Sequence, residues 1–221
     1  MLRNLFFSLS VSVVFAGCAG CPMPPGPGDG GDNDGGSADA GDNFAESAKG
    51  KVRFKRNVRL TVDYAQALGL SLTEVCNELG LYPCTTAVHA LALGGVDPYG
   101  SGLYEPIPFS GSTSPIAIDR VALSACTTRV TRDQQNPAFG VIYKFPLDSS
   151  GKISNIEGSE VDLALTTLYE RTVLRQPTDD EKTHLKGLYA DIVASGKPEP
   201  GKAWMILSCF AVTTSVEFLF Y

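Results

Sequence analysis

The chain changes its hydrophobic pattern twice along its length. Residues 5–14 are mostly apolar, whereas residues 19–43 contain eight Gly, four Pro and five Asp, with Met23 as the only large apolar side chain. Such a polar segment cannot bury enough surface to offset its ordering entropy, so residues 18–50 are predicted to be a disordered tether. Over residues 51–221 apolar positions recur with the spacings of secondary structure, which predicts a globular domain.

The second half of this domain has the clearest helical pattern. Ser114-Pro115 combines an N-cap residue with Pro at the first helical position, which predicts a helix as far as Val130. Helices are also predicted for residues 161–174 and for residues 178–196, which begin with a Thr-x-x-Glu capping box. Residues 202–220 are apolar nearly all round and should form the most buried helix. Three arginines are expected on the other faces of the first helix or at its end: Arg120, Arg129 and Arg132.

The first half of the domain is predicted to be less regular. Apolar and polar residues alternate over residues 51–62, which predicts a strand, and residues 141–145 predict a second one. A capping-box pattern at Ser71 and Glu74 predicts a short helix that Gly80 ends. The predicted fold class is mainly α: an irregular helical domain with a few short strands, braced by disulfides, behind a disordered linker.

A long central loop is expected over residues 81–113, and a sub-boundary of the domain is considered near 150–158. Loops of this length within a compact domain are often binding surfaces. The alternative is irregular structure strapped down onto the domain. The candidate binding residues of this loop are His89, Asp97, Tyr99 and Tyr104.

The start of the chain has the pattern of an exported protein. The apolar run over residues 5–14 is too short to cross about 30 Å of hydrocarbon, and it follows a single basic side chain, as in a signal peptide. Ala16-Gly17-Cys18 resembles the lipobox of bacterial lipoproteins. The resemblance implies that residues 1–17 are a lipoprotein signal peptide and that Cys18 carries diacylglycerol. The alternative is an ordinary signal peptide followed by an incidental cysteine.

Export changes the interpretation of the other cysteines. Four of the six lie in the globular part, an even number that an oxidising compartment favours pairing: Cys76, Cys84, Cys126 and Cys209. Of the three connectivities we favour Cys76–Cys84, which closes a short loop, with Cys126–Cys209, which joins two apolar helices. The alternative is buried free thiols.

The charge distribution bears on partners. A net charge of −6 opposes binding to nucleic acid, and in general to anionic lipid headgroups, so no nucleic-acid partner is expected. Beyond the signal segment, no stretch of about 20 residues is apolar enough to span a membrane, which leaves the lipid as the expected attachment. The basic residues of the predicted strand over 51–62 admit two interpretations. We favour a solvated strand face over a surface that contacts anionic lipid.

Few residues are arranged for catalysis. The chain has two histidines: His184 fits a solvated helix face, and His89 lies among apolar neighbours that favour a packed side chain. Cys84 and His89 could form a thiolate–imidazole pair, but a disulfide to Cys76 has the stronger claim on that thiol. We therefore assign no catalytic residue, no metal site, no cofactor and no small-molecule substrate.

The C-terminal helices resemble a known module. The segment Leu168-Tyr169-Glu170-Arg171 through Pro177-Thr178, followed by Glu181 and by a closing Ser215-Val216-Glu217-Phe218-Leu219, is similar to the C-terminal helical region of planctomycete cytochrome-c-associated exported proteins, a family of uncharacterised domains. The similarity covers about 60 residues of the chain and implies a helical exported module rather than an activity. Relatives often bind haem through Cys-x-x-Cys-His. Cys84 lacks both a second cysteine and an adjacent His, so no covalent haem is expected.

These patterns lead to one principal hypothesis and one alternative. The principal hypothesis is a membrane-anchored lipoprotein that serves as a non-catalytic binding or structural module for another exported protein. Ala19 after the lipidated cysteine favours, by analogy, the outer membrane, with the domain facing the periplasm or the cell surface. The alternative is a redox or enzymatic accessory protein that uses a Cys84/His89 site.

Overall fold

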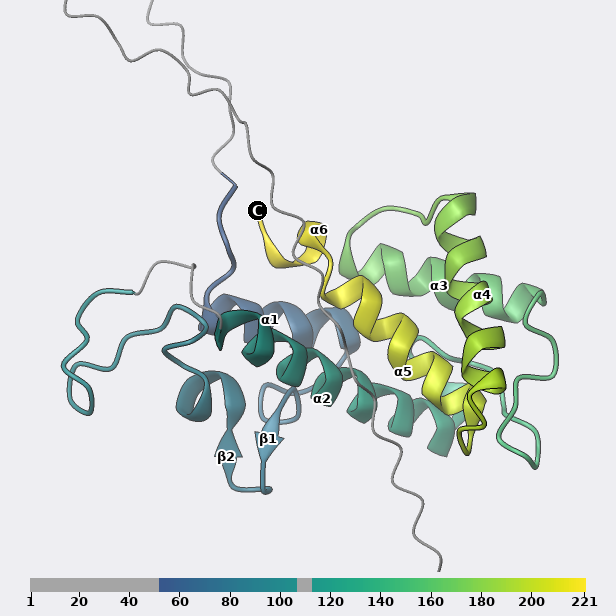
Figure 1. The fold of residues 1–221 in the computed structure, drawn as a ribbon, viewed down its shortest axis with the longest axis horizontal. Helices are drawn as coiled ribbons and strands as arrows, with labels where there is room; N and C mark the ends of the chain where they lie inside the picture. The colour runs from purple at the N-terminus through teal and green to yellow at the C-terminus, as the bar shows by residue number, and fades with distance from the viewer. Residues whose placement is uncertain (1–51, 107–112) are drawn as a thin grey trace, which may run out of the picture. The chain divides into compact units, whose positions relative to one another are not determined.

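The computed structural model describes residues 52–106 and 113–221, and over these residues the protein is mainly helical (Figure 1). The predicted fold class is confirmed: helices, one short two-stranded sheet, irregular connections and two disulfides. The predicted signal peptide, the predicted tether and Cys18 lie outside the described residues.

Six α-helices and two short strands organise the described part of the chain. The helices are α1 (Asn57–Leu68), α2 (Thr113–Gln135), α3 (Ser159–Thr172), α4 (Asp179–Ala194), α5 (Pro200–Thr213) and α6 (Val216–Leu219). A hairpin of β1 (Asn77–Glu78) and β2 (Tyr82–Pro83) precedes a π-helical turn, η1 (Cys84–Val88), and a 3₁₀ turn, η2 (Pro137–Phe139), follows α2. Strands β1 and β2 are antiparallel, with Asn77 opposite Pro83 and Glu78 opposite Tyr82.

Three predicted helices are confirmed as α2, α3 and α4. Helix α2 begins at Thr113 and continues five residues beyond the predicted end at Val130. Helix α4 begins with the predicted capping box: the Glu181 N–H donates to the Thr178 hydroxyl at 3.2 Å, and the Thr178 N–H donates to the Glu181 carboxylate at 2.7 Å. A complete capping box satisfies two backbone donors with neighbouring residues, so the sequence alone could predict this helix start.

The strand predicted for residues 51–62 is wrong beyond its first positions. The chain is extended only near Arg53–Lys55, where the N–H groups of Arg53 and Lys55 donate to the carbonyls of Tyr221 and Leu219, both at 2.9 Å. From Asn57 it is helix α1, which buries Leu60, Tyr64 and Leu68 at helical spacing. The apolar positions that suggested alternation do not face the core in the same way, since Val58 is 63% exposed.

Two further local predictions are wrong for tertiary reasons. The Ser71 N–H does donate to the Glu74 carboxylate at 2.9 Å, but the chain makes turns there and enters the β1–β2 hairpin instead of a helix. The Cys76–Cys84 disulfide and the bond from the Cys84 N–H to the Cys76 carbonyl close that hairpin. Residues 141–145 form no strand, because their backbone wraps around a carboxylate of α2.

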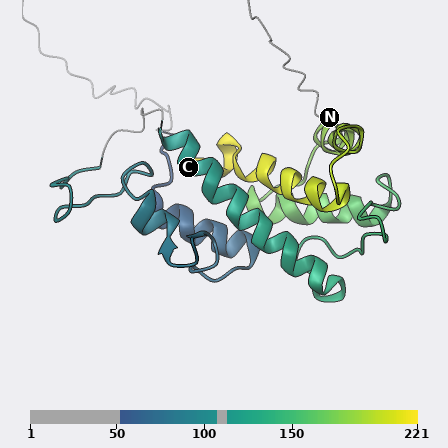
Figure 2. The ribbon, with the colours of Figure 1, turned by 60° about the horizontal axis from the view of Figure 1, so that its bottom comes forward.

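The predicted last helix is divided into α5 and α6. The Ser215 hydroxyl accepts a hydrogen bond from the Phe218 N–H at 3.4 Å and begins the second piece. Helix α5 packs against α2, α3 and α4, and Figure 2 shows it alongside α2. Its buried side chains include Trp204, whose indole N–H donates to the Leu185 carbonyl of α4 at 2.7 Å.

Two buried tyrosines tie α5 to the rest of the core. The Tyr64 hydroxyl donates to the Thr213 carbonyl at 2.9 Å, and the Tyr143 hydroxyl donates to the Met205 carbonyl at 2.7 Å. Burial raises the pKa of both phenols well above the ordinary value of 10, so both remain neutral donors. A buried phenol requires such a partner, because an unpaired buried hydroxyl is costly.

The interior also contains an ion pair that the helical pattern did not predict. Arg129, expected on another face or near the end of the helix, is buried, and its guanidinium lies 2.7 Å from the carboxylate of Asp133, which is 0% exposed. Asp133 also accepts the backbone N–H groups of Val141, Ile142 and Tyr143 at 2.8–3.1 Å. A buried carboxylate is tolerated when its oxygens are satisfied in this way.

Arginines from two other helices satisfy the C-terminal end of α1. Arg129 of α2 donates to the carbonyls of Leu68 and Gly69, and Arg171 of α3 donates to those of Gln66 and Ala67 at 2.7–2.9 Å. The last carbonyls of a helix lack intrahelical partners and carry partial negative charge, so guanidinium donors stabilise this end.

Both predicted disulfides are confirmed. Cys76–Cys84 braces the β1–β2 hairpin, and Cys126–Cys209 joins α2 to α5 across the core, where both cysteines of the second pair are fully buried. The second bond spans 83 residues of sequence and the first only eight. The chain-entropy argument therefore assigns the larger stabilisation to Cys126–Cys209.

The double substitution Cys126→Ser with Cys209→Ser should lower the melting temperature by about 10 °C, because the lost cross-link is worth about 4.5 kcal/mol in the chain-entropy model. Thermal unfolding followed by circular dichroism measures it. The matched control, Cys76→Ser with Cys84→Ser, should cost less, about 2.5 kcal/mol. An unchanged melting temperature for the first pair would contradict the role given to that bond.

An exposed ion cluster joins α4 and α6 to the end of α3. The Arg175 guanidinium contacts the Glu181 carboxylate at 2.6 Å and the Glu217 carboxylate at 2.9 Å. The hydrogen bonds from Arg175 lower the pKa of Glu181 most, and the hydrogen bond from the Thr178 N–H lowers it further. Together they hold this pKa at about 2, below its ordinary value of 4.5. Because the folded-state pKa is lowered, the carboxylate stabilises the fold above about pH 4.5, and this contribution is lost as the pH falls towards 2.

Glu181→Gln should therefore lower the melting temperature at pH 7, and its difference from the wild type should shrink progressively below about pH 4.5. Melting curves of both proteins between pH 7 and pH 2 test this expectation. Glu170→Gln is the matched control, because Glu170 is exposed and makes no ion pair with another described residue. A difference that stays constant down to pH 2 would exclude the Arg175 cluster as its cause.

Candidate functional site

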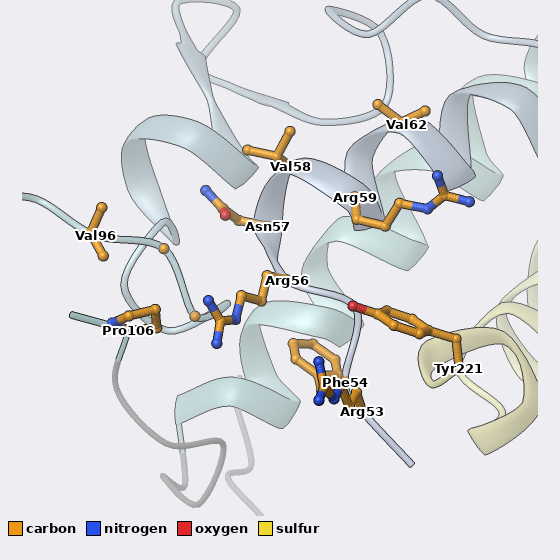
Figure 3. Close-up of a pocket in the computed structure, with 12 residues that line it drawn as sticks. Arg53, Phe54, Arg56, Asn57, Val58, Arg59, Val62, Val96, Pro106 and Tyr221 are labelled. Carbon is orange, nitrogen blue, oxygen red and sulfur yellow. The ribbon is translucent and has the colours of Figure 1, made fainter. Parts of the chain in front are cut away.

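A basic pocket lies where the described chain begins, at the start of α1 (Figure 3). Its volume is about 1150 Å³, which is large enough for an organic ligand. Its walls come from three parts of the sequence: the first described segment, the loop before residue 107 and the last described residue. The lining residues are Arg53, Phe54, Arg56, Asn57, Val58, Arg59, Val62, Gly94, Gly95, Val96, Pro106 and Tyr221.

Hydrogen bonds fasten the start of α1 to the residues that precede the pocket loop. The Asn57 N–H donates to the Leu93 carbonyl at 2.9 Å, and the Asn57 side chain donates to the Thr85 carbonyl at 3.2 Å. Gly95 permits the close approach, because a Cβ at this position would lie 2.8 Å from both the Ala90 carbonyl oxygen and the Asn57 amide nitrogen. The pocket wall is thus built on a rigid helix and on a loop fastened to it.

The three arginines of the pocket differ in their partners. Arg59 is engaged, since its guanidinium lies 2.9 Å from the Asp63 carboxylate, which also binds Lys55 at 3.0 Å. Arg53 and Arg56 are exposed and form no ion pair within residues 52–106 and 113–221. In Figure 3 the Arg56 side chain extends towards Pro106, whereas Arg59 turns away along α1. Two guanidinium groups are therefore available to a ligand.

Arg56 occupies an electrostatically unfavourable position. It is the N-cap residue of α1, where its side chain makes no capping hydrogen bond. The first turn of the helix contains no acidic residue. Helix N-termini carry partial positive charge, which favours Ser, Thr, Asp or Asn at the N-cap and disfavours a cation there. The local sequence thus concentrates positive charge at a place where helix stability alone would favour the opposite.

The remaining walls of the pocket are apolar. Val58 and Tyr221 are 63% and 67% exposed, and Phe54, Val96 and Pro106 complete the surface around the guanidinium groups. None of the described residues that line it is Asp, Glu, His or Cys. The pocket is therefore suited to hold an anionic group attached to an apolar body, and its lining is suited to binding.

The predicted loop residues have different surroundings in the structure. The His89 Nε2 atom lies 3.0 Å from the Glu78 carboxylate, which also contacts Arg120 at 3.5 Å. Asp97 accepts the Gly100 N–H at 2.9 Å within its own loop. Tyr99 is fully exposed and Tyr104 is 76% exposed, and their predicted binding role stays a prediction.

The thiolate–imidazole pair of the alternative hypothesis is not formed. Cys84 is bonded to Cys76, and His89 has Glu78 as its partner. Within the described ranges, no three His, Cys, Asp or Glu side chains are grouped so that they could hold a metal ion. Likewise, no helix of that part has the length and apolar character needed to cross a bilayer.

The sequence pattern did not predict the pocket, because it assigned the basic residues of the lining to a strand. On a strand Arg53 and Arg59 would share one face and Arg56 would lie on the other, whereas the helical start places Arg56 and Arg59 together with Val58 in the lining of one pocket. The sequence did contain a feature that indicates an anion-binding site, namely the run of basic residues over 51–59 without Asp or Glu. Residue spacing could not predict that Gly95, Pro106 and Tyr221 line the same pocket as these basic residues.

Comparison with protein-family models, with curated proteins and with solved structures finds no match to this chain. The resemblance of the C-terminal helices to planctomycete cytochrome-c-associated proteins therefore stays a prediction. Residues that carry it nevertheless have a structural role here, since Glu181 and Glu217 meet at Arg175.

Arg56→Ser should raise the free energy of unfolding by about 1 kcal/mol, because it replaces a cation at the helix N-cap with a favourable capping residue. Chemical denaturation at low ionic strength measures the change. Arg53→Ser removes the same charge outside the helix and should leave stability nearly unchanged. Equal effects of the two substitutions would show that the helix terminus does not disfavour Arg56.

Proposed function

We propose that this protein is an exported lipoprotein, anchored to a membrane through Cys18, whose domain is a non-catalytic binding or structural module for another exported protein. The observation that carries the proposal is the use of all four cysteines of the domain in two disulfides. Structural disulfides form and persist in oxidising compartments, which agrees with the signal-peptide and lipobox pattern of the first 18 residues.

A rigid apolar hairpin supports the binding role. Leu79, Leu81 and Tyr82 are 88%, 72% and 53% exposed at the tip of the β1–β2 hairpin, and the Cys76–Cys84 disulfide holds its base. Leu79 has a φ of 56°, in the left-handed region that a leucine rarely adopts. A bulky apolar residue kept exposed in a strained turn is better explained by a contact that it makes than by the stability of the domain.

The placement at the outer membrane follows the same sequence argument. Ala19, rather than Asp, follows the lipidated cysteine of the proposed lipobox. The domain would face the periplasm or the cell surface, joined to its anchor through the Gly-, Pro- and Asp-rich residues 18–50.

Intact mass spectrometry of the unreduced protein, purified from the membranes of its host, tests the anchor. The expected mass is that of residues 18–221 plus the lipid, less four hydrogens for the two disulfides. Cys18→Ser should abolish the lipid increment and release the protein from the membrane fraction. A mature mass without lipid would refute the anchor, and a haem-sized or metal-sized increment would refute a cofactor-free module.

The binding role is tested in the same cells with a photo-cross-linking residue at Leu81, and with the same residue at Leu163 as the matched control. Leu163 is a comparably exposed leucine on α3, away from the hairpin sequence. We expect one discrete exported protein to be joined at residue 81 and none at residue 163. Identical adducts at both positions would contradict a specific contact at the hairpin.

A further inference from the structure

We propose that the pocket at the start of α1 binds the phosphate of an anionic phospholipid, so that the domain docks on the surface of the membrane to which the chain is anchored. The inference rests on the proposed membrane attachment and adds to it a second, non-covalent site. It gives a ligand class to a pocket in which Arg53 and Arg56 form no ion pair with another described residue.

Positive charge is concentrated in the segment that enters α1. Five of the 18 Lys and Arg residues lie within residues 51–59, which contain no acid, although the whole chain carries a net charge of −6. The acidic balance of the whole chain therefore does not describe this segment of the sequence. Basic clusters next to a membrane anchor are attracted to anionic lipid at about 1 kcal/mol per cation.

Two of the cations that line the pocket are not used in ion pairs among the described residues. Arg53 and Arg56 both line the pocket and lack ion-pair partners among the described residues, in contrast to Arg59 and Lys55, which share Asp63. A guanidinium presents two parallel N–H donors that match two oxygens of a phosphate. Arg56, unfavourable at a helix N-cap, becomes favourable once a phosphate neutralises it.

The size and apolar walls of the pocket favour a lipid over a free anion. The volume of about 1150 Å³ is far larger than a phosphate ion needs, and apolar walls surround the guanidinium groups. Val58, Val96 and Tyr221 are exposed at this pocket, and Val52 beside it is 71% exposed. Aliphatic and tyrosine side chains next to cations suit the headgroup region of a bilayer, where an apolar body and a polar tip are both accommodated.

Vesicle co-sedimentation of the full chain tests the inference, with Cys18→Ser introduced so that no lipid anchor contributes. The probes are vesicles of phosphatidylcholine alone and of an equal mixture of phosphatidylcholine and phosphatidylglycerol. We expect binding to the mixture only, and an affinity about 30-fold lower after Arg53→Gln with Arg56→Gln, from about 1 kcal/mol per cation.

The matched control removes the same charge elsewhere, with Lys144→Gln and Lys197→Gln, two exposed lysines that line none of the described pockets. The control should retain at least a third of the wild-type affinity. Equal weakening by both pairs would overturn the pocket in favour of non-specific attraction. Circular dichroism melts of all variants establish that each is folded.

A competition with soluble glycerol phosphate separates a lipid surface from a small-anion site. We expect it to displace vesicles only weakly, because it lacks the apolar contacts and the many headgroups of a bilayer. Tight binding of glycerol phosphate without vesicle binding would overturn the lipid proposal. The vesicle experiment does not depend on the lipid anchor. If the protein binds vesicles but the protein purified from its host carries no lipid, the lipoprotein proposal is refuted and the assignment of the pocket is not.

Discussion

The buried carboxylate of Asp133 is the contact on which the rest of the domain depends. It lies inside the protein, where a charge is tolerated only with its oxygens satisfied, and it binds Arg129 together with three backbone N–H groups after α2. The same arginine reaches the end of α1, and the segment held by the carboxylate delivers the Tyr143 hydroxyl to α5. One carboxylate thus connects α2 with α1 and α5, beside the disulfide that joins α2 to α5 covalently.

The position of α1 determines the pocket, because the helix is held at both ends by residues distant in sequence. Arg129 and Arg171 bind the carbonyls at its C-terminal end, and Leu93 and Thr85 bind Asn57 at its start. A site built on a helix fixed in this way is more precisely positioned than one on a free loop. The arginines at the start of α1 are therefore presented at a defined place, next to the apolar side chains of the pocket.

The two ends of α1 use arginine for opposite physical purposes. At the C-terminal end, guanidinium groups from α2 and α3 meet unsatisfied carbonyls and negative partial charge, so they stabilise the fold. At the N-terminal end, Arg56 and its neighbour Arg53 meet the positive end of the helix and no carboxylate among the described residues. An arrangement that stability alone would not favour is expected where a ligand completes the charge balance, and the proposed anionic membrane surface would do so.

Local signals in the sequence predicted three helices: the Thr178–Glu181 capping box fixed the start of α4, and the apolar spacing indicated α2 and α3. Cysteine number and the expected compartment likewise identified both disulfides. Contacts between distant residues decided the rest. Residues 51–62 carry apolar side chains compatible with period two, but burial of Leu60, Tyr64 and Leu68 selected a helix. Residues 141–145, predicted as a strand, instead bend around the Asp133 carboxylate, which accepts the Tyr143 N–H. The pocket forms where Gly95, Pro106 and Tyr221 meet the start of α1.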